Sequence, residues 1–124
     1  MRTWVFKFAS YKAPDDIFDF IKSGRKTIET RPASPKYTLV APGDRMTFVS
    51  LASRKRLTRT VTFVHYYKTV RDLVYSEDPD QIFPGSGSAE NLLSLFTELK
   101  RKWGPDYAHK LDTLGIFAFG LSSQ

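Results

Sequence analysis

The nine residues SGRKTIETR, from Ser23 to Arg31, decide the fold of this chain. They follow a segment from Pro14 onward whose apolar residues recur at helical spacing, and Gly24 is suited to end that helix as a C-terminal cap. From Thr27 to Arg31 the β-branched residues favour a strand, with Glu29 and Arg31 on one face. The stretch therefore brings a lysine, a glutamate and an arginine to one corner of the fold.

The rest of the chain indicates a single domain spanning residues 1–124. At this length a domain buries about two thirds of the surface that its unfolded form exposes, and 15% aromatic residues suit a small barrel or sheet core. Alternation, caps and turn residues predict the following elements: strands 3–9, 27–31, 46–51, 59–66 and 114–121, helices 14–24, 69–75 and 88–103, and a loop from Ser76 to Gly87. The last strand is apolar on both faces, so we expect it to be central. Without regular βαβ alternation, this pattern predicts an α+β mixed barrel of about five strands with three flanking helices.

The residue inventory excludes several classes of site. The chain has no cysteine, so it has no disulfide, no thiolate nucleophile and no cysteine zinc site. Its two histidines, His65 and His109, are far apart and lack metal-binding spacing, so we expect no metal and no cofactor. No apolar stretch is long enough to cross a membrane, and residues 1–8 lack the apolar core of a signal peptide. We therefore expect a soluble intracellular protein of the cytoplasm or nucleus.

The charge of the chain favours an anionic partner. Lys and Arg number 19 against 13 Asp and Glu, giving a net charge of +6, which suits nucleic acid or a phosphorylated metabolite, although it also serves plain solubility. The densest basic cluster, Arg54, Lys55 and Arg56 with Arg59 nearby, falls at the tip of a predicted hairpin. Such a tip can contact phosphates, and it can equally protect a sheet edge from aggregation.

The signature GxKxxExR is occupied here by Gly24, Lys26, Glu29 and Arg31. In this the chain resembles the ASCH domain, a branch of the PUA-like barrel superfamily. The order of the surrounding features agrees, because the signature follows a helix and precedes a Pro-Gly-Asp turn (42–44) that leads into a strand. The segment from Gln81 to Glu90 resembles the linker and helix start of archaeal-type ASCH proteins, so the similarity covers nearly the whole chain. One departure is Thr-Leu-Gly-Ile at 113–116, where the family often has Tyr-Gly-Val.

The resemblance implies a small PUA-like barrel with a cleft for RNA or nucleotide-derived ligands. Some relatives are amidohydrolases that remove the acetyl group of N4-acetylcytidine, and others have been described as ribonucleases. The amidohydrolase pattern, GxKxxT, uses the lysine as base and the threonine as nucleophile, with a glutamate on a later helix. Lys26 matches that lysine and Glu90 is a match for the glutamate, but Glu29 stands where the threonine would be.

Each candidate residue also has a purely structural interpretation. An ordinary lysine is neutral in only about one molecule in 2,500 at pH 7, so Lys26 needs a lowered pKa to act as a base. It needs no pKa shift to bind an anion. In the structural interpretation, Lys26 is a solvated residue that follows a helix cap. Glu29 and Arg31 can pair either to brace the barrel or to orient a ligand, for which arginine offers bidentate contacts. Glu90 in a first helical turn is already stabilised by the helix dipole.

Tyr66 and Tyr67 follow a predicted strand and offer a stacking face to a base, although alternation predicts that one of them packs in the core.

Three hypotheses follow. The first is RNA or nucleotide binding in a cleft lined by Lys26, Glu29 and Arg31, with Tyr66 and Glu90. The second is hydrolysis of N4-acylated cytidine or of RNA, with Lys26 as base and Glu29 and Glu90 as further catalytic candidates. The third is a protein-interaction module that uses the basic hairpin.

Overall fold

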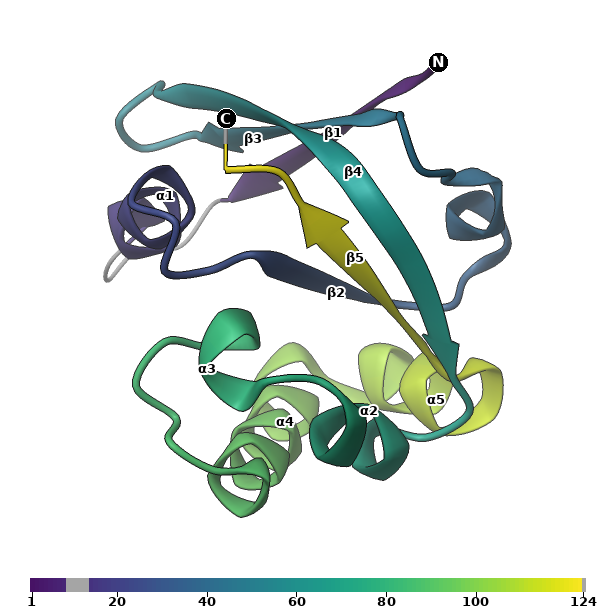
Figure 1. Cartoon of the computed structure of the whole chain (residues 1–124). Helices are drawn as coiled ribbons and strands as arrows, with labels where there is room; N and C mark the ends of the chain where they lie inside the picture. The colour runs from purple at the N-terminus through teal and green to yellow at the C-terminus, as the bar shows by residue number, and fades with distance from the viewer. Residues whose placement is uncertain (9–13, 124) are drawn as a thin grey trace.

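Five strands form one mixed sheet that curls into a half-barrel (Figure 1). The computed structural model describes residues 1–8 and 14–123, so Ala9 of the first predicted strand lies outside the described residues. The strands are β1 (Thr3–Phe8), β2 (Ile28–Pro32), β3 (Arg45–Ser50), β4 (Arg56–Tyr67) and β5 (Ile116–Leu121). Their order is β1-β3-β4-β5-β2, in which β1 pairs with β3 in parallel and all other pairs are antiparallel. The predicted α+β barrel class is confirmed.

Helices flank the sheet on two sides. They are α1 (Pro14–Lys22), the 3-10 helix η1 (Pro35–Leu39), α2 (Val70–Ser76), α3 (Pro79–Ile82), α4 (Ala89–Trp103) and α5 (Pro105–Leu114). In Figure 1, α2 to α5 gather below β2 and β5, whereas β1, β3 and the first part of β4 form the opposite side of the molecule.

The described residues contain five α-helices where the sequence predicts three. One extra helix, α3, lies inside the predicted loop, where Asp78 accepts a hydrogen bond from the Asp80 N–H and Pro79 occupies the first turn. The other, α5, follows Gly104, whose φ of 91° ends α4. Pro105 then starts a new helix, because proline lacks only an N–H that a first turn leaves unpaired anyway. Leu114 therefore belongs to α5 and not to the last strand.

Strand β5 divides the interior into two cores, and all six of its residues are buried as predicted. Phe117, Phe119 and Leu121 pack inside the half-barrel with Phe6 and Phe48. The alternate residues of β5, Ile116 and Ala118, face the helical layer in a second core, whose members include Leu73, Leu92 and Leu111. None of the helices in the described part of the chain combines the length and the apolar character needed to cross a bilayer.

Candidate functional site

The segment from Ser23 to Arg31 begins with the predicted helix cap. Gly24 has a φ of 80°, a conformation that L side chains rarely adopt, and its N–H donates to the Ile21 carbonyl at 3.1 Å. The Lys26 N–H then donates to the Phe20 carbonyl at 2.9 Å. These contacts turn the chain from α1 into β2, so that the charged residues of the segment enter the fold at the start of a strand.

Lys26 lies buried between β2 and α3. Its Nζ donates to the carbonyl oxygens of Ile28 and Ile82, each at 2.7 Å, and stands 3.8 Å from Glu29 Oε1. The neighbouring Thr27 contacts the same helix, because its N–H donates to the Gln81 carbonyl at 3.0 Å. The interpretation of Lys26 as a solvated residue is therefore wrong: its ammonium group fastens the start of β2 to the end of α3.

Burial lowers the pKa of Lys26 from its ordinary value, while the Glu29 carboxylate opposes this shift and the Arg31 guanidinium adds to it. The neutral amine is thus more accessible here than on an exposed lysine. However, the two carbonyl oxygens that accept hydrogen bonds from Nζ favour a donor with all its protons in place. Lys26 is therefore suited first to hold structure and charge, and second to take up a proton.

Glu29 connects the two cations of the segment. Its side chain is 9% exposed, its Oε1 accepts a hydrogen bond from the Thr30 N–H at 2.9 Å, and its Oε2 lies 3.6 Å from Arg31 Nη2. The predicted ion pair between Glu29 and Arg31 is confirmed. Lys26, Glu29 and Arg31 form a continuous array, here called the charge cluster, with a formal charge of one carboxylate and two cations, or +1.

Arg31 is the member of the charge cluster that reaches the surface. Its guanidinium carbon lies 4.3 Å from the centre of the Phe6 ring, and its Nε is a buried donor with no hydrogen-bond partner. The Arg31 side chain is 26% exposed, against 10% for Lys26. A ligand that approaches the cluster would therefore meet Arg31 before the other two residues.

Tyr107 is a neighbour of the cluster that sequence reasoning missed. It lies on α5, which packs against β2, and its ring contacts Trp103 with centroids 4.9 Å apart. Burial raises the pKa of Tyr107 to about 12. The Arg31 guanidinium lowers this pKa, whereas the Glu29 carboxylate raises it. The aromatic residues at 103 and 107 were the available signal, but α5 itself was not predicted.

Tyr66 lies on the same side of the sheet as Arg31. Both residues pair with Phe117, Arg31 from β2 and Tyr66 from β4, so the three side chains form one row across three strands. Tyr66 is 54% exposed, whereas Tyr67 is partly buried against the helical core. The prediction that one of the two tyrosines packs inside is confirmed, and Tyr66 is the one that stays exposed.

The other candidates lie elsewhere. Glu90, at the start of α4, accepts a hydrogen bond from the Tyr75 hydroxyl at 3.2 Å, and none of its described contacts joins it to the charge cluster. The residues Arg54, Lys55 and Arg56 lie at the far end of β4 from Tyr66. The ten residue steps from Arg56 to Tyr66 correspond to about 30 Å of strand. The basic hairpin is therefore a separate surface.

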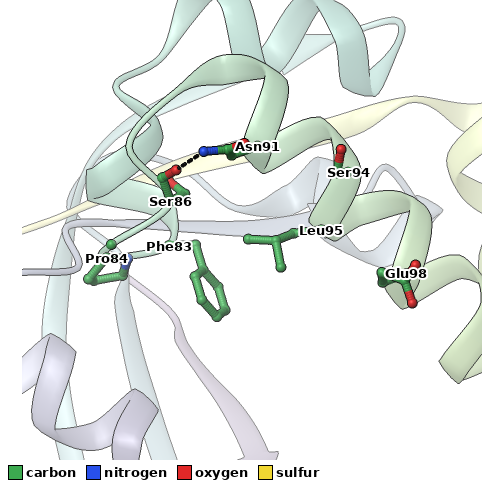
Figure 2. Close-up of a pocket in the computed structure, with 8 residues that line it drawn as sticks. Phe83, Pro84, Ser86, Asn91, Ser94, Leu95 and Glu98 are labelled. Carbon is green, nitrogen blue, oxygen red and sulfur yellow. Dashed lines mark hydrogen bonds between the residues drawn. The ribbon is translucent and has the colours of Figure 1, made fainter.

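Two shallow hollows flank the segment between α3 and α4. The larger, about 400 Å³, lies between that segment and α4 (Figure 2). Phe83, Pro84 and Leu95 supply its apolar wall, and Asn91 Nδ2 donates to the Ser86 carbonyl at 2.8 Å on its rim. The second hollow lies on the other side of Pro84 and Gly85, next to Arg25. Neither hollow is lined by a residue of the charge cluster.

Comparison with known proteins places this geometry in a known fold. No protein-family model matches the sequence, and no curated protein matches it either. Among solved structures, the hypothetical protein PH0355 superposes with a TM-score of 0.71 at 19% identity, over 97% of both chains. The protein PF0455 from Pyrococcus furiosus has a TM-score of 0.63 at 20% identity, over 97% of this chain and 96% of that one.

An ASCH domain from Lactobacillus crispatus JV V101 matches 98% of this chain and 79% of its own, with a TM-score of 0.63 at 12% identity. This chain has the ASCH-domain fold. The architecture that the sequence signature predicted is thus confirmed. In this chain, the signature residues Gly24 and Lys26 join the end of α1, the start of β2 and the end of α3.

Proposed function

We propose that this ASCH-fold protein binds RNA or a nucleotide-derived ligand at the charge cluster, and that Arg31 makes the direct contact. The observation that carries the proposal is the state of Arg31, which stacks on Phe6 while its Nε lacks a partner. A guanidinium held over a ring has a restricted orientation, and the terminal nitrogens of such a group can contact a phosphate or a base edge in bidentate fashion.

The charges around Arg31 support an anionic ligand. Lys26 and Arg31 exceed Glu29 by one positive charge, and Glu29 is already engaged by the Thr30 N–H. A phosphate would therefore complete the cluster without displacing an existing ion pair. Tyr66, in the same row of side chains, offers an exposed ring for stacking on a base.

The test is a calorimetric titration with cytidine 5′-monophosphate, which carries a single phosphate and so isolates this site from extended backbone contacts. We expect Arg31→Gln to weaken binding roughly tenfold or more, since a hydrogen bond to a charged group is worth about 1.5–3 kcal/mol. Arg31→Lys keeps the charge but loses the planar fork, so its affinity should fall in between. Equal affinity of Arg31→Gln and wild type would overturn the proposal.

The matched control is Lys102→Gln, which removes one positive charge from the exposed end of α4. It should bind as wild type does. A loss of affinity in this variant equal to that in Arg31→Gln would mean that only the net charge matters, and it would refute a specific contact by Arg31.

Hydrolysis is a second candidate, favoured by the lowered pKa of Lys26. In this mechanism the Lys26 amine would take a proton from water or from the substrate, with N4-acylated cytidine or RNA as the substrate class. Glu29, 3.8 Å away, would stabilise the ammonium group that forms. The position of the threonine nucleophile of the resembled amidohydrolases is held by Glu29, so water would have to be the attacking group.

The test is product formation from N4-acetylcytidine and from RNA by wild type and by Lys26→Arg. Arginine retains the positive charge and the donors but cannot be deprotonated in a protein, so a base role predicts a folded and inactive variant. Comparable rates in both proteins would remove Lys26 as the base. Absence of product with wild type on both substrates would dismiss hydrolysis of this class.

A further inference from the structure

The strands β1, β3 and β4 carry positive charges without any carboxylate. From Arg45 to Tyr67 the chain has five Lys or Arg residues and no Asp or Glu, and β1 adds Lys7 with no acidic residue. The nearest acidic residue in sequence, Asp44, is buried. It accepts hydrogen bonds from the Arg2 N–H, the Ala41 N–H and Trp4 Nε1, and these hold the pKa of its carboxyl below the usual range.

The strand register gathers part of this charge on one face. Residues that pair across these three strands form three rows whose side chains point away from the barrel core, here called the basic sheet face. Its rows are Thr3, Arg45 and Thr60; then Val5, Thr47 and Thr58; then Lys7, Val49 and Arg56. The intervening residues, such as Phe6 and Phe48, point into the barrel core, which confirms the direction of the others.

The basic sheet face has no helix over it among the described residues. Helices α2 to α5 lie beyond β2 and β5, on the far side of the molecule in Figure 1. Helix α1 approaches β3 from the inside, since Phe18 and Ile21 belong to the barrel core. Lys7, Arg45 and Arg56 are accordingly exposed, as on a sheet that packs one face on the core and leaves the other in solvent.

The hairpin between β3 and β4 extends the same surface. Its turn is held by hydrogen bonds from the Arg54 N–H to the Ser50 carbonyl at 2.8 Å and from the Ser50 N–H to the Lys55 carbonyl at 3.0 Å. Arg54 adopts a φ of 62°, a strained conformation for a residue other than glycine, and is exposed. Two further cations, Arg54 and Lys55, thus continue the row that ends in Arg56.

We propose that the basic sheet face and its hairpin bind the sugar-phosphate backbone of single-stranded RNA. Phosphates need cations and hydroxyl donors on an open surface, and this face offers three exposed cations beside Thr3, Thr58 and Thr60, which are exposed or half-buried. Thr47 is buried, and its hydroxyl shares a hydrogen bond with that of Thr58. An anionic membrane would instead favour aromatic and long apolar side chains among the cations, and Val5 and Val49 are the apolar residues of the nine. The choice of RNA rests on the proposed function, but none of the residues of the charge cluster takes part.

The test measures how the affinity for a short labelled RNA of uniform sequence depends on salt between about 50 and 200 mM. Each phosphate contact to a single strand contributes about 0.7 to the slope of log affinity against log salt. The triple variant Lys7→Gln, Arg45→Gln, Arg56→Gln should therefore lower the slope by about two. Its titration with cytidine 5′-monophosphate should equal that of wild type, so that failure here and failure at the charge cluster are distinguished.

The matched control removes the same number of positive charges, three, from the helical layer, as the triple variant Arg71→Gln, Lys102→Gln, Lys110→Gln. Both variants lower the net charge of +6 by three, but the control should keep the slope of wild type. Equal slopes in the two triple variants would overturn the proposal. So would an unchanged slope in the sheet variant combined with its loss of binding to vesicles of anionic phospholipid or to an acidic peptide.

Discussion

The ammonium group of Lys26 joins two backbone carbonyls that are far apart in sequence, at Ile28 and Ile82. A buried cation that satisfies two buried acceptors at once is costly to remove, because both carbonyls lose a donor and the Glu29 carboxylate loses a neighbouring positive charge. In the proposed functions, Lys26 would serve both stability and activity, so a loss of activity on changing Lys26 has to be separated from a loss of folding.

We predict that Lys26→Met lowers the free energy of unfolding by about 3 kcal/mol, as expected when one partner of a buried ion pair is removed. Urea denaturation followed by circular dichroism measures this. Lys22→Met, at the exposed end of α1, is the matched control and should change stability by less than about 0.5 kcal/mol. Equal effects of the two substitutions would show that the Lys26 hydrogen bonds contribute little.

Two tyrosines should ionise late. Burial, reinforced by the hydrogen bond to Glu77, raises the pKa of Tyr67 to about 12, and burial raises that of Tyr107 to about 12 as well. The unfolded chain ionises near 10, so both groups stabilise the fold fully below pH 10, and this contribution is lost as the pH rises from 10 to 12.

Absorbance of tyrosinate against pH should show this late phase, and Tyr67→Phe should remove part of it. The stability difference between wild type and Tyr67→Phe should shrink between pH 10 and 12. A tyrosinate titration of wild type that is complete by pH 11, with no late phase, would contradict the assignment.

At the scale of the elements, β5 requires a glycine where it crosses β4. A Cβ added at Gly120 would lie 2.2 Å from ring carbons of Phe63, beside the irregularity of the β4 register between Val61 and Phe63. We predict that Gly120→Ala destabilises the protein by about 1–3 kcal/mol, the usual cost of overpacking. Phe63→Leu should restore part of that loss in the double variant, as measured by a double-mutant cycle in urea. Strict additivity of the two changes would rule out the clash.

The elements also show what the sequence could and could not predict. Thr69 and Ser88 cap α2 and α4 as expected, because an N-cap is a local signal within four residues. Gly104-Pro105 ends the predicted helix 88–103, but the same pair also starts α5, and local chemistry does not distinguish a helix end from a new helix start. Similarly, the face that Glu29 and Arg31 share follows from the strand period, whereas the contact of Lys26 with Ile82 depends on packing across 56 residues.

At the scale of the whole molecule, the two cores share β5 and should unfold together. Trp4 packs against the barrel core and Trp103 ends α4, so each tryptophan reports on one half of the structure. We predict that Trp4→Phe and Trp103→Phe variants, each followed by the fluorescence of the remaining tryptophan, give urea transitions that coincide with that of their own circular dichroism. Fluorescence and circular dichroism midpoints that separate within either variant would indicate two independent units.

The uneven distribution of charge along the chain affects how the molecule orients during diffusion. Residues 45–67 carry five Lys or Arg and no carboxylate, a charge of +5, while residues 68–114 carry six Lys or Arg against eight Asp or Glu, a charge of −2; residues 1–44 contribute the remaining +3. Such a molecule has a permanent electric dipole, and the field of a polyanion would rotate it during diffusion. The sheet end would then reach the polyanion first. This orientation would raise the association rate more than it would change the equilibrium affinity.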